Sequence, residues 1–201
     1  MIIGIAGRLG SGKDTVGEVI QKLCLTNNEV EFEIKKFAGK LKTIASLVTG
    51  VPLEKFEDQE FKQKHMGLQW DMTYREFLQK LGTEGMRVGV HTNIWVNALF
   101  SDYNPVTYSD RGGWEYPNWI ITDMRFPNEL KAVEEREGIT IRVTRPDILS
   151  FEAMLHPSET ALDDAKFDYE IINDGNIEDL VDKVKEILIQ EKIIVDGIHS
   201  N

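Results

Sequence analysis

The fold of this chain is decided by its first fifteen residues, Met1-Ile2-Ile3-Gly4-Ile5-Ala6-Gly7-Arg8-Leu9-Gly10-Ser11-Gly12-Lys13-Asp14-Thr15. The apolar run over residues 1–6 is typical of a buried strand. After the loop, apolar residues recur at helical spacing, at Val16, Val19, Ile20 and Leu23. A glycine-rich loop ending in Gly-Lys between a strand and a helix predicts a phosphate-binding loop, because the glycines let backbone N–H groups turn towards phosphate oxygens. Lys13 can reach the β- and γ-phosphates of a nucleoside triphosphate.

The residue after Lys13 departs from the common pattern of such loops. That pattern has Ser or Thr at this position, whereas this chain has Asp14 followed by Thr15. A carboxylate there would repel phosphates unless it faces away from them or towards Mg²⁺. A chance glycine turn is the alternative interpretation of the loop, and the strand and helix in register on either side argue against it.

Composition and charge narrow the class of protein. The chain has 201 residues, of which 41% are hydrophobic and 28% charged, so we expect one domain over residues 1–201 with a full core. The formal net charge of −11 argues against nucleic acid as a partner, since a duplex binder needs a basic face. A small anionic ligand is compatible with this charge if a few arginines converge in one cleft.

Cysteine content and apolar runs bear on the compartment. The single cysteine, Cys24, cannot form an internal disulfide, which fits a reducing compartment, and its apolar helical neighbours favour a packing role over a catalytic thiol. The apolar stretch at the start is too short for a signal peptide, and no run has the length of a membrane span. We therefore expect no membrane association and a cytoplasmic location.

Strand and helix patterns alternate along the rest of the chain. Further strands are predicted at residues 32–37, 119–122, 139–143 and 169–172. Helices are predicted at residues 41–48, 73–88, 92–100, 127–137 and 177–189, the second with a capping box formed by Thr73 and Glu76. The remaining segments predict an exposed helical insert at 54–70, an irregular loop or small hairpin at 101–118, and a mobile cover at 146–164. This alternation predicts an α/β fold in which a five-stranded parallel sheet has helices on both faces.

The segment from Asp123 to Asn128 follows a predicted buried strand. Ligands of parallel sheets bind beyond the carboxyl ends of the strands, and this is such an end. Asp123 could hold the Mg²⁺ shell or orient an acceptor oxygen, and Arg125 could bind a phosphate through two parallel hydrogen bonds. The alternative is a plain Asp–Arg pair at a strand–helix corner, which the nearby phosphate loop makes less favoured.

Two further groups contain arginines. Arg75, Gln79, Gly82 and, less directly, Arg87 fall near one stripe of the predicted helix 73–88, although spacing alone favours an ordinary amphipathic helix. Arg142 and Arg145 precede the predicted cover, from which arginines could move onto a transferring phosphoryl group. His156 has no second metal ligand at suitable spacing, and we interpret it as a cover residue.

Several of these segments together carry a family resemblance. The most specific are Arg75-Glu76-Phe77-Leu78-Gln79-Lys80-Leu81-Gly82-Thr83-Glu84 and Thr122-Asp123-Met124-Arg125-Phe126-Pro127-Asn128-Glu129. The others are the loop itself, Phe37-Ala38-Gly39-Lys40-Leu41-Lys42, Ile94-Trp95-Val96-Asn97, His156-Pro157-Ser158-Glu159-Thr160 and Asn173-Asp174-Gly175. In these segments the chain resembles the bacteriophage deoxynucleoside monophosphate kinases, and Asp14 agrees with that family, where Lys-Asp-Thr closes the loop. Residues 51–72 and 101–117 are the least covered.

The resemblance implies a three-layer P-loop NTPase fold of the nucleoside monophosphate kinase type. It implies transfer of the γ-phosphoryl group of ATP to a deoxynucleoside monophosphate, with Mg²⁺ as cofactor. Residues of about 38–100 would bind the acceptor, and residues of about 146–164 would form the lid. The sequence leaves open whether two copies of the chain form a homodimer. If a phage encodes the chain, as the resemblance implies, the expected location is the host cytoplasm.

The resemblance also implies site residues. ATP would be bound by Gly7, Gly10, Ser11, Gly12, Lys13, Asp14, Thr15, Arg142, Asn173 and Gly175. The acceptor would be bound by Phe37, Lys42, Arg75, Gln79, Arg87, Asp123, Arg125 and Asn128. Catalysis would involve Lys13, Asp123, Arg125 and Arg145, and Mg²⁺ would be held by Thr15 and Asp123, directly or through water.

The expected mechanism is direct in-line transfer without a covalent enzyme intermediate. An acceptor phosphate is already ionised near neutral pH, so Asp123 need not act as a base. One alternative is another small-molecule P-loop kinase, of the phosphomevalonate or dephospho-coenzyme A kinase type. The other is a nucleotide-binding switch or assembly ATPase that is not a kinase; the Asn-Lys-x-Asp motif of a guanine switch is missing from the sequence.

Overall fold

The computed structural model describes residues 1–107, 113–146 and 156–195. Its contacts divide the chain into two compact units. The first consists of residues 1–36 together with the chain from residue 104 onward, and the second consists of residues 37–103. The second unit has nearly the extent of the acceptor-binding region that the sequence predicts at about 38–100.

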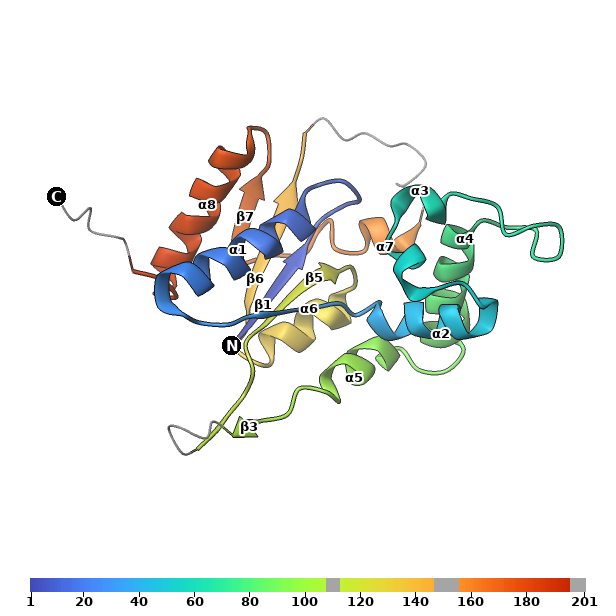
Figure 1. Cartoon of the computed structure of the whole chain (residues 1–201), viewed down its shortest axis with the longest axis horizontal. Coiled ribbons are helices and arrows are strands. Elements are labelled where there is room, and N and C mark those ends of the chain that lie inside the picture. Colours follow the sequence, from blue (N-terminus) through green and yellow to red (C-terminus); the bar gives the residue numbers. More distant parts are fainter. Residues whose placement is uncertain (108–112, 147–155, 196–201) are drawn as a thin grey trace. The chain divides into compact units, whose positions relative to one another are not determined.

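A five-stranded parallel sheet forms the centre of the first unit (Figure 1). Its strands, in spatial order, are β2 (Glu33–Lys35), β5 (Trp119–Met124), β1 (Ile2–Ala6), β6 (Ile139–Thr144) and β7 (Tyr169–Ile172). All five residues of β1 are buried, as expected of a central strand that is covered on both faces. The register places Gly4 of β1 opposite both Ile121 and Thr140. The predicted parallel sheet is therefore confirmed.

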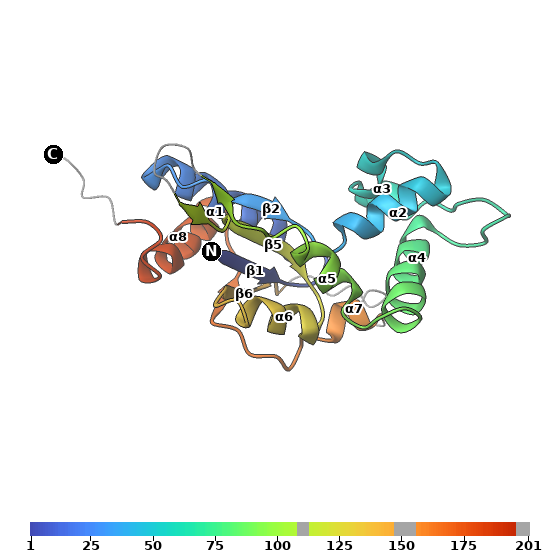
Figure 2. The same cartoon turned by 90° about the horizontal axis from the view of Figure 1, so that it is seen from below.

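Helices cover both faces of this sheet (Figure 2). On one face, α1 (Lys13–Asn28) and α8 (Ile177–Gln190) lie side by side, and a Cβ at Gly17 of α1 would lie 3.8 Å from the Ile5 side chain. On the other face lies α6 (Pro127–Glu134), since a Cβ at Gly4 would lie 3.1 Å from Val133. Adjacent strand residues point to opposite faces, so Gly4 and Ile5 define the two sides. The predicted three-layer arrangement is confirmed.

The main apolar core lies between the sheet, α1 and α8. It includes Ile5 from β1, Ile20 and Cys24 from α1 and Val184 from α8, all almost completely buried. Burial raises the pKa of the Cys24 thiol to about 11, because the thiolate would lose its hydration there. Cys24 is thus an unreactive packing residue, as its apolar neighbours in the sequence predict.

The predicted hairpin within residues 101–118 is present. β3 (Val106–Thr107) pairs antiparallel with β4 (Trp114–Glu115), and residues 108–112 between them lie outside the described ranges. The helix α7 (Pro157–Thr160) lies in the segment predicted as a cover, of which residues 147–155 are likewise outside the described ranges. Among the helices that the structure describes, none combines the length and apolar character needed to cross a membrane.

The second unit is helical. Its elements are α2 (Gly39–Thr49), η1 (Leu53–Phe56), α3 (Gln59–Lys62), α4 (Tyr74–Gln79), η2 (Lys80–Val88) and α5 (Ile94–Phe100). Ala45, Phe56 and Phe77 form its core. The predicted capping box at Thr73 and Glu76 starts α4, with the hydroxyl and the carboxylate each accepting the other residue's backbone N–H.

The structure corrects one prediction within this unit and refines another. The segment 54–70 is not an exposed insert throughout, because Phe56 is completely buried and packs edge-on against Phe61 and Tyr74. The helix predicted at 73–88 is confirmed as one continuous helix made of α4 and η2, of which η2 has the wider turn of a π-helix. Such wide turns are rare and often occur at functional sites.

Element ends differ from the prediction in the first unit. The strand β5 extends through Asp123 to Met124, so Asp123 is a strand residue and does not follow the strand. The helix α6 ends at Glu134 and does not reach Glu137, because Glu137 adopts left-handed geometry and Gly138 N–H donates to Val133 O. The strand β2 is shorter than predicted.

Candidate active site

The loop between β1 and α1 has the geometry of a phosphate cradle. Gly10 and Gly12 have φ angles of 80° and 95°, which lie in the left-handed region that favours glycine. Gly7 has no room for a side chain, because a Cβ there would lie 2.6 Å from the carbonyl oxygen of Val143. The first residue of α1 is Lys13, so the helix N-terminus, with its unpaired N–H groups, opens onto the loop.

Two polar side chains of the loop are buried. Ser11 is 2% exposed, and its hydroxyl has no hydrogen-bond partner among the described residues. Lys13 is 6% exposed, and burial lowers the pKa of its ammonium, as does the positive charge of Arg125. The carboxylates of Asp14, Glu159 and Asp123 partly offset this lowering, so all three acids lie near Lys13. A buried donor and a buried cation would be satisfied by an anion bound at the loop.

The carboxylate of Asp14 is directed to the edge of the sheet. Its Oδ1 accepts a hydrogen bond from the Thr122 hydroxyl at 2.9 Å and pairs with Lys36 Nζ at 3.1 Å. Burial alone would raise the pKa of Asp14, but Lys36 and the Thr122 hydroxyl lower it overall. The unusual acid after Lys13 is therefore neutralised by Lys36, which reduces the repulsion that a phosphate would meet.

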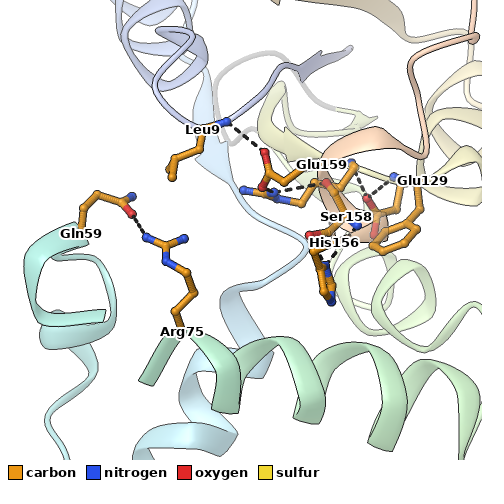
Figure 3. A network of polar contacts seen from close by, with 9 residues as sticks. Leu9, Gln59, Arg75, Glu129, His156, Ser158 and Glu159 are labelled. Carbon is orange, nitrogen blue, oxygen red and sulfur yellow. Dashed lines mark hydrogen bonds and ion pairs between the residues drawn. The ribbon is translucent and has the colours of Figure 1, made fainter. Parts of the chain in front are cut away.

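Arg125 is held at its backbone and at its side chain. Its N–H donates to the buried carboxylate of Glu129 at 2.8 Å. Its guanidinium pairs with the carboxylate of Glu159 and donates to the carbonyl oxygen of Ser158 at 3.2 Å. The other oxygen of Glu159 accepts the backbone N–H of Leu9, in the phosphate loop, at 3.0 Å (Figure 3). One carboxylate thus joins Arg125 to the loop.

The segment that carries Glu159 is stabilised by hydrogen bonds between neighbouring residues. The Nδ1 atom of His156 accepts the backbone N–H of Ser158 at 3.2 Å and lies 2.8 Å from its hydroxyl (Figure 3). His156 therefore caps α7, and no group of three or more His, Cys, Asp or Glu side chains within the described ranges could hold a metal ion.

Arg142 makes structural contacts with the segment that follows α7. Its guanidinium donates to the carbonyl oxygens of Leu162, Asp163 and Ala165 at 2.5–3.1 Å and lies over the ring of Phe167 at 4.6 Å. The side chain predicted to bind ATP is thus engaged by three carbonyl groups, and it fixes the segment 162–167 to the end of β6.

A cavity of about 470 Å³ lies beside the loop. It is bordered by loop residues, by Met124 and Arg125 at the end of β5, by residues 142–146 at the end of β6, and by residues of the segment 158–167. Arg142 and Arg145 both line this cavity. Arg145 is exposed, whereas Arg142 is half-buried. The carboxyl ends of β1, β5 and β6 thus meet at one hollow, as is usual for parallel sheets.

The turn after β7 contacts the loop directly. Asn173 Nδ2 donates to the carbonyl oxygen of Ser11 at 2.9 Å, and a Cβ at Gly12 would lie 2.5 Å from the same nitrogen. Gly175 precedes α8, and a Cβ there would lie 2.2 Å from Asp179 Oδ2, so the Asp179 side chain would have to move. Asn173 is therefore placed to fix the backbone of the phosphate loop.

Five of the predicted acceptor residues lie in the second unit. Lys42 is buried and contacts both carboxylate oxygens of Glu57 at 2.7 Å, and Arg75 donates to Gln59 Oε1 at 2.9 Å (Figure 3). Arg87 is buried and donates to the carbonyl oxygen of Thr92, Gln79 is half-buried at the end of α4, and Phe37 is buried edge-on against Phe100. The remaining acceptor residues, Asp123, Arg125 and Asn128, belong to the first unit.

Glu159 is a site residue that was not predicted from the sequence. The signal for it was present, because Glu159 lies in the His-Pro-Ser-Glu-Thr segment that carries the resemblance. The contact with Leu9 spans 150 positions in the chain, and no local pattern predicts such a pairing.

Comparison with known proteins places the chain in a family. The family model described as deoxynucleotide monophosphate kinase matches residues 39–184. The chain is 32% identical over 187 residues to the uncharacterized protein ORF77 of Ictalurid herpesvirus 1, covering 92% of this chain and 69% of that protein. It is 30% identical over 120 residues to the deoxynucleotide monophosphate kinase of Enterobacteria phage T4, covering 60% of this chain and 46% of that enzyme. It is 23% identical over 235 residues to the deoxynucleoside-5'-monophosphate kinase of Escherichia phage T5, covering 86% of this chain and 89% of that enzyme.

Two solved structures are similar over almost their whole length. The shikimate kinase of Aquifex aeolicus has a TM-score of 0.44 at 13% identity, with 96% of each chain covered. The dephospho-CoA kinase of Campylobacter jejuni has a TM-score of 0.45 at 14% identity, covering 97% of this chain and 98% of that one. The family assignment rests on the sequence matches and not on these two structures. By the extent of the family match, this chain belongs to the deoxynucleotide monophosphate kinase family.

Proposed function

We propose that this nucleotide kinase transfers the γ-phosphoryl group of ATP to a deoxynucleoside monophosphate, giving the deoxynucleoside diphosphate and so supplying DNA precursors. The observation that carries the donor half is the loop itself, with a buried Lys13 and a buried Ser11 hydroxyl that has no partner within the described ranges. The acceptor half is supported by the family match, which covers the predicted acceptor residues from Lys42 to Asn128.

The chain's own groups would act mainly through charge and position. Phosphoryl transfer brings two polyanions together, and catalysis consists largely of holding them in line and neutralising charge. We assign Lys13 to the β- and γ-phosphates of ATP, and Arg125 and Arg145 to the transferring phosphoryl group and the acceptor phosphate. Asp123 would position the acceptor or the metal, since an ionised acceptor phosphate needs no base.

The residues around the loop fit a Mg²⁺ ion. The Thr15 hydroxyl and the Asp123 carboxylate are hard oxygen donors beside Lys13, and Mg²⁺ in such enzymes uses one or two carboxylates together with substrate phosphates. We propose that these two residues hold it, directly or through water. When bound, the ion would neutralise charge on the phosphates of ATP.

An ADP-release assay tests this proposal. ATP and Mg²⁺ are supplied with each deoxynucleoside monophosphate in turn, and with shikimate, dephospho-coenzyme A and phosphomevalonate as competing acceptor classes. We expect at least one deoxynucleoside monophosphate to raise turnover well above the acceptor-free rate. The proposal fails if none does so, and a high acceptor-free rate would indicate a plain ATPase.

Two variants make the assay specific to the loop. Lys13→Ala removes the cation assigned to the phosphates, and turnover is expected to fall by about a thousandfold, since preorganised charge contributes several kcal/mol to such reactions. Lys22→Ala removes an exposed lysine from the same helix and is expected to leave turnover unchanged. Far-UV circular dichroism should show both variants folded.

A further inference from the structure

Glu159 contacts two donors of the kind that bind phosphate. Its carboxylate accepts the backbone N–H of Leu9 with one oxygen and pairs with Arg125 through the other. Its side chain is only 7% exposed, and it lies close enough to Lys13 to raise the pKa of that ammonium. Three positively polarised groups of the candidate site therefore act on this single carboxylate.

A phosphate oxygen and a carboxylate oxygen are the same kind of acceptor for these groups. Both take charge-assisted hydrogen bonds from backbone N–H groups and from guanidinium. The N–H of Leu9 and the Nη1 group of Arg125, which also donates to Ser158 O, cannot serve Glu159 and a nucleotide phosphate at once. Any polyanion that uses them must first displace this carboxylate.

The position of Glu159 is determined by the fold on both sides of it. On one side, His156 caps α7, and on the other the Arg142 guanidinium donates to the carbonyl oxygens of Leu162, Asp163 and Ala165. A further ion pair joins Asp163 to Arg8 of the loop at 2.8 Å. The carboxylate is thus presented to the loop by an anchored segment.

We propose that Glu159 is a positioning residue that competes with the triphosphate of the donor. While it is engaged, it holds Arg125 against the tip of the loop, and its displacement by phosphate oxygens frees the guanidinium for the transferring group. This inference rests on the proposed function, because it takes the Gly7–Thr15 loop to be the triphosphate site.

Binding of inorganic tripolyphosphate, measured by calorimetry at low salt, tests this competition without any acceptor. Glu159→Gln keeps the shape of the side chain and removes its charge, and we expect it to bind tripolyphosphate about tenfold more tightly than the wild type. The gain should shrink in 0.5 M salt, which screens charge. A merely structural role of Glu159 predicts the opposite, since damage to the site weakens binding.

Two further variants complete the test. Glu135→Gln makes the same change of net charge at an exposed position directly after α6 and should bind as the wild type does. Glu159→Ala should also bind more tightly, and it keeps the test usable if Glu159→Gln is unstable. The inference is overturned if both Glu159 variants bind tripolyphosphate equally or more weakly. If wild type and Lys13→Ala bind it equally poorly, the loop is not a triphosphate site, and the proposed function fails instead.

Discussion

The hydroxyl of Thr122 donates a hydrogen bond to the carboxylate of Asp14, with 2.9 Å between Oγ1 and Oδ1. Thr122 lies in β5 and is completely buried, whereas Asp14 is the second residue of α1. The contact ties the start of the helix to the neighbouring strand, and Lys36 neutralises the acid from the end of β2. The acid that departs from the common loop pattern therefore serves to anchor the loop.

Replacing Asp14 tests this anchoring. Asp14→Asn should lower the free energy of unfolding by about 0.5 kcal/mol at pH 7, the size expected for a partly exposed ion pair. The pKa of Asp14 is lowered below 3.8 in the folded state, so its stabilising effect is full above pH 3.8 and is lost as the pH falls through the lowered value. Urea unfolding at pH 7 and pH 2.5 measures this. A stability difference that is equal at both pH values, or equal to that of Glu18→Gln on the same helix, would contradict it.

The pH dependence of ATP binding reports on Lys13. Burial lowers the pKa of this ammonium below 10.5, whereas bound phosphates would favour its charged form. ATP affinity is therefore expected to fall as the pH rises, and to begin falling at a lower pH than for an ordinary lysine. Calorimetry between pH 7 and pH 10 should also show proton uptake on binding. Lys13→Arg should abolish this pH dependence, because arginine stays protonated; a dependence that persists in Lys13→Arg would assign it to another group.

The contact between Asn173 and Ser11 predicts a defect in donor binding. Asn173→Ala removes a hydrogen bond to the loop backbone worth roughly 1 kcal/mol, and the KM for ATP should rise about fivefold with little change in the acceptor KM. Gly12→Ala should be much more harmful, since Gly12 has a φ of 95° and a Cβ would meet Asn173 at 2.5 Å. The double variant should not recover activity, because the φ angle remains unfavourable. Recovery would show that the clash alone is responsible.

Arg125 is held beside the loop by contacts of both its backbone and its side chain, so we expect its replacement to impair phosphoryl transfer. Arg125→Ala should reduce kcat by about 100-fold, because a cation held next to the loop is removed, while the fold is retained. Arg136→Ala, at an exposed arginine just beyond the end of α6, is the matched control and should have near-normal turnover. Steady-state kinetics over both substrates separate the effects. If Arg125→Ala leaves both kcat and the acceptor KM unchanged, Arg125 has no part in the reaction.

Local patterns predicted most of the elements correctly. The loop, the capping box at Thr73 and the strand Tyr169–Ile172 agree with the structure because each depends on residues close together in the chain. The errors arose where distant packing decides the outcome. Phe56 lies among charged residues and yet joins a core with Ala45 and Phe77, and the end of α6 depends on how Gly138 packs beside β1.

The sequence by itself determined the fold class, the phosphate loop and the family, because these depend on spacing within short segments. The tertiary structure decided which groups meet. It placed Asp14 on Thr122, Asn173 on the loop backbone, and Glu159 between Leu9 and Arg125. These contacts join residues more than one hundred positions apart, or, for Arg125 and Glu159, 34 positions apart across two strand ends. Such pairs are set by the order of strands in the sheet and by burial, which no local spacing encodes.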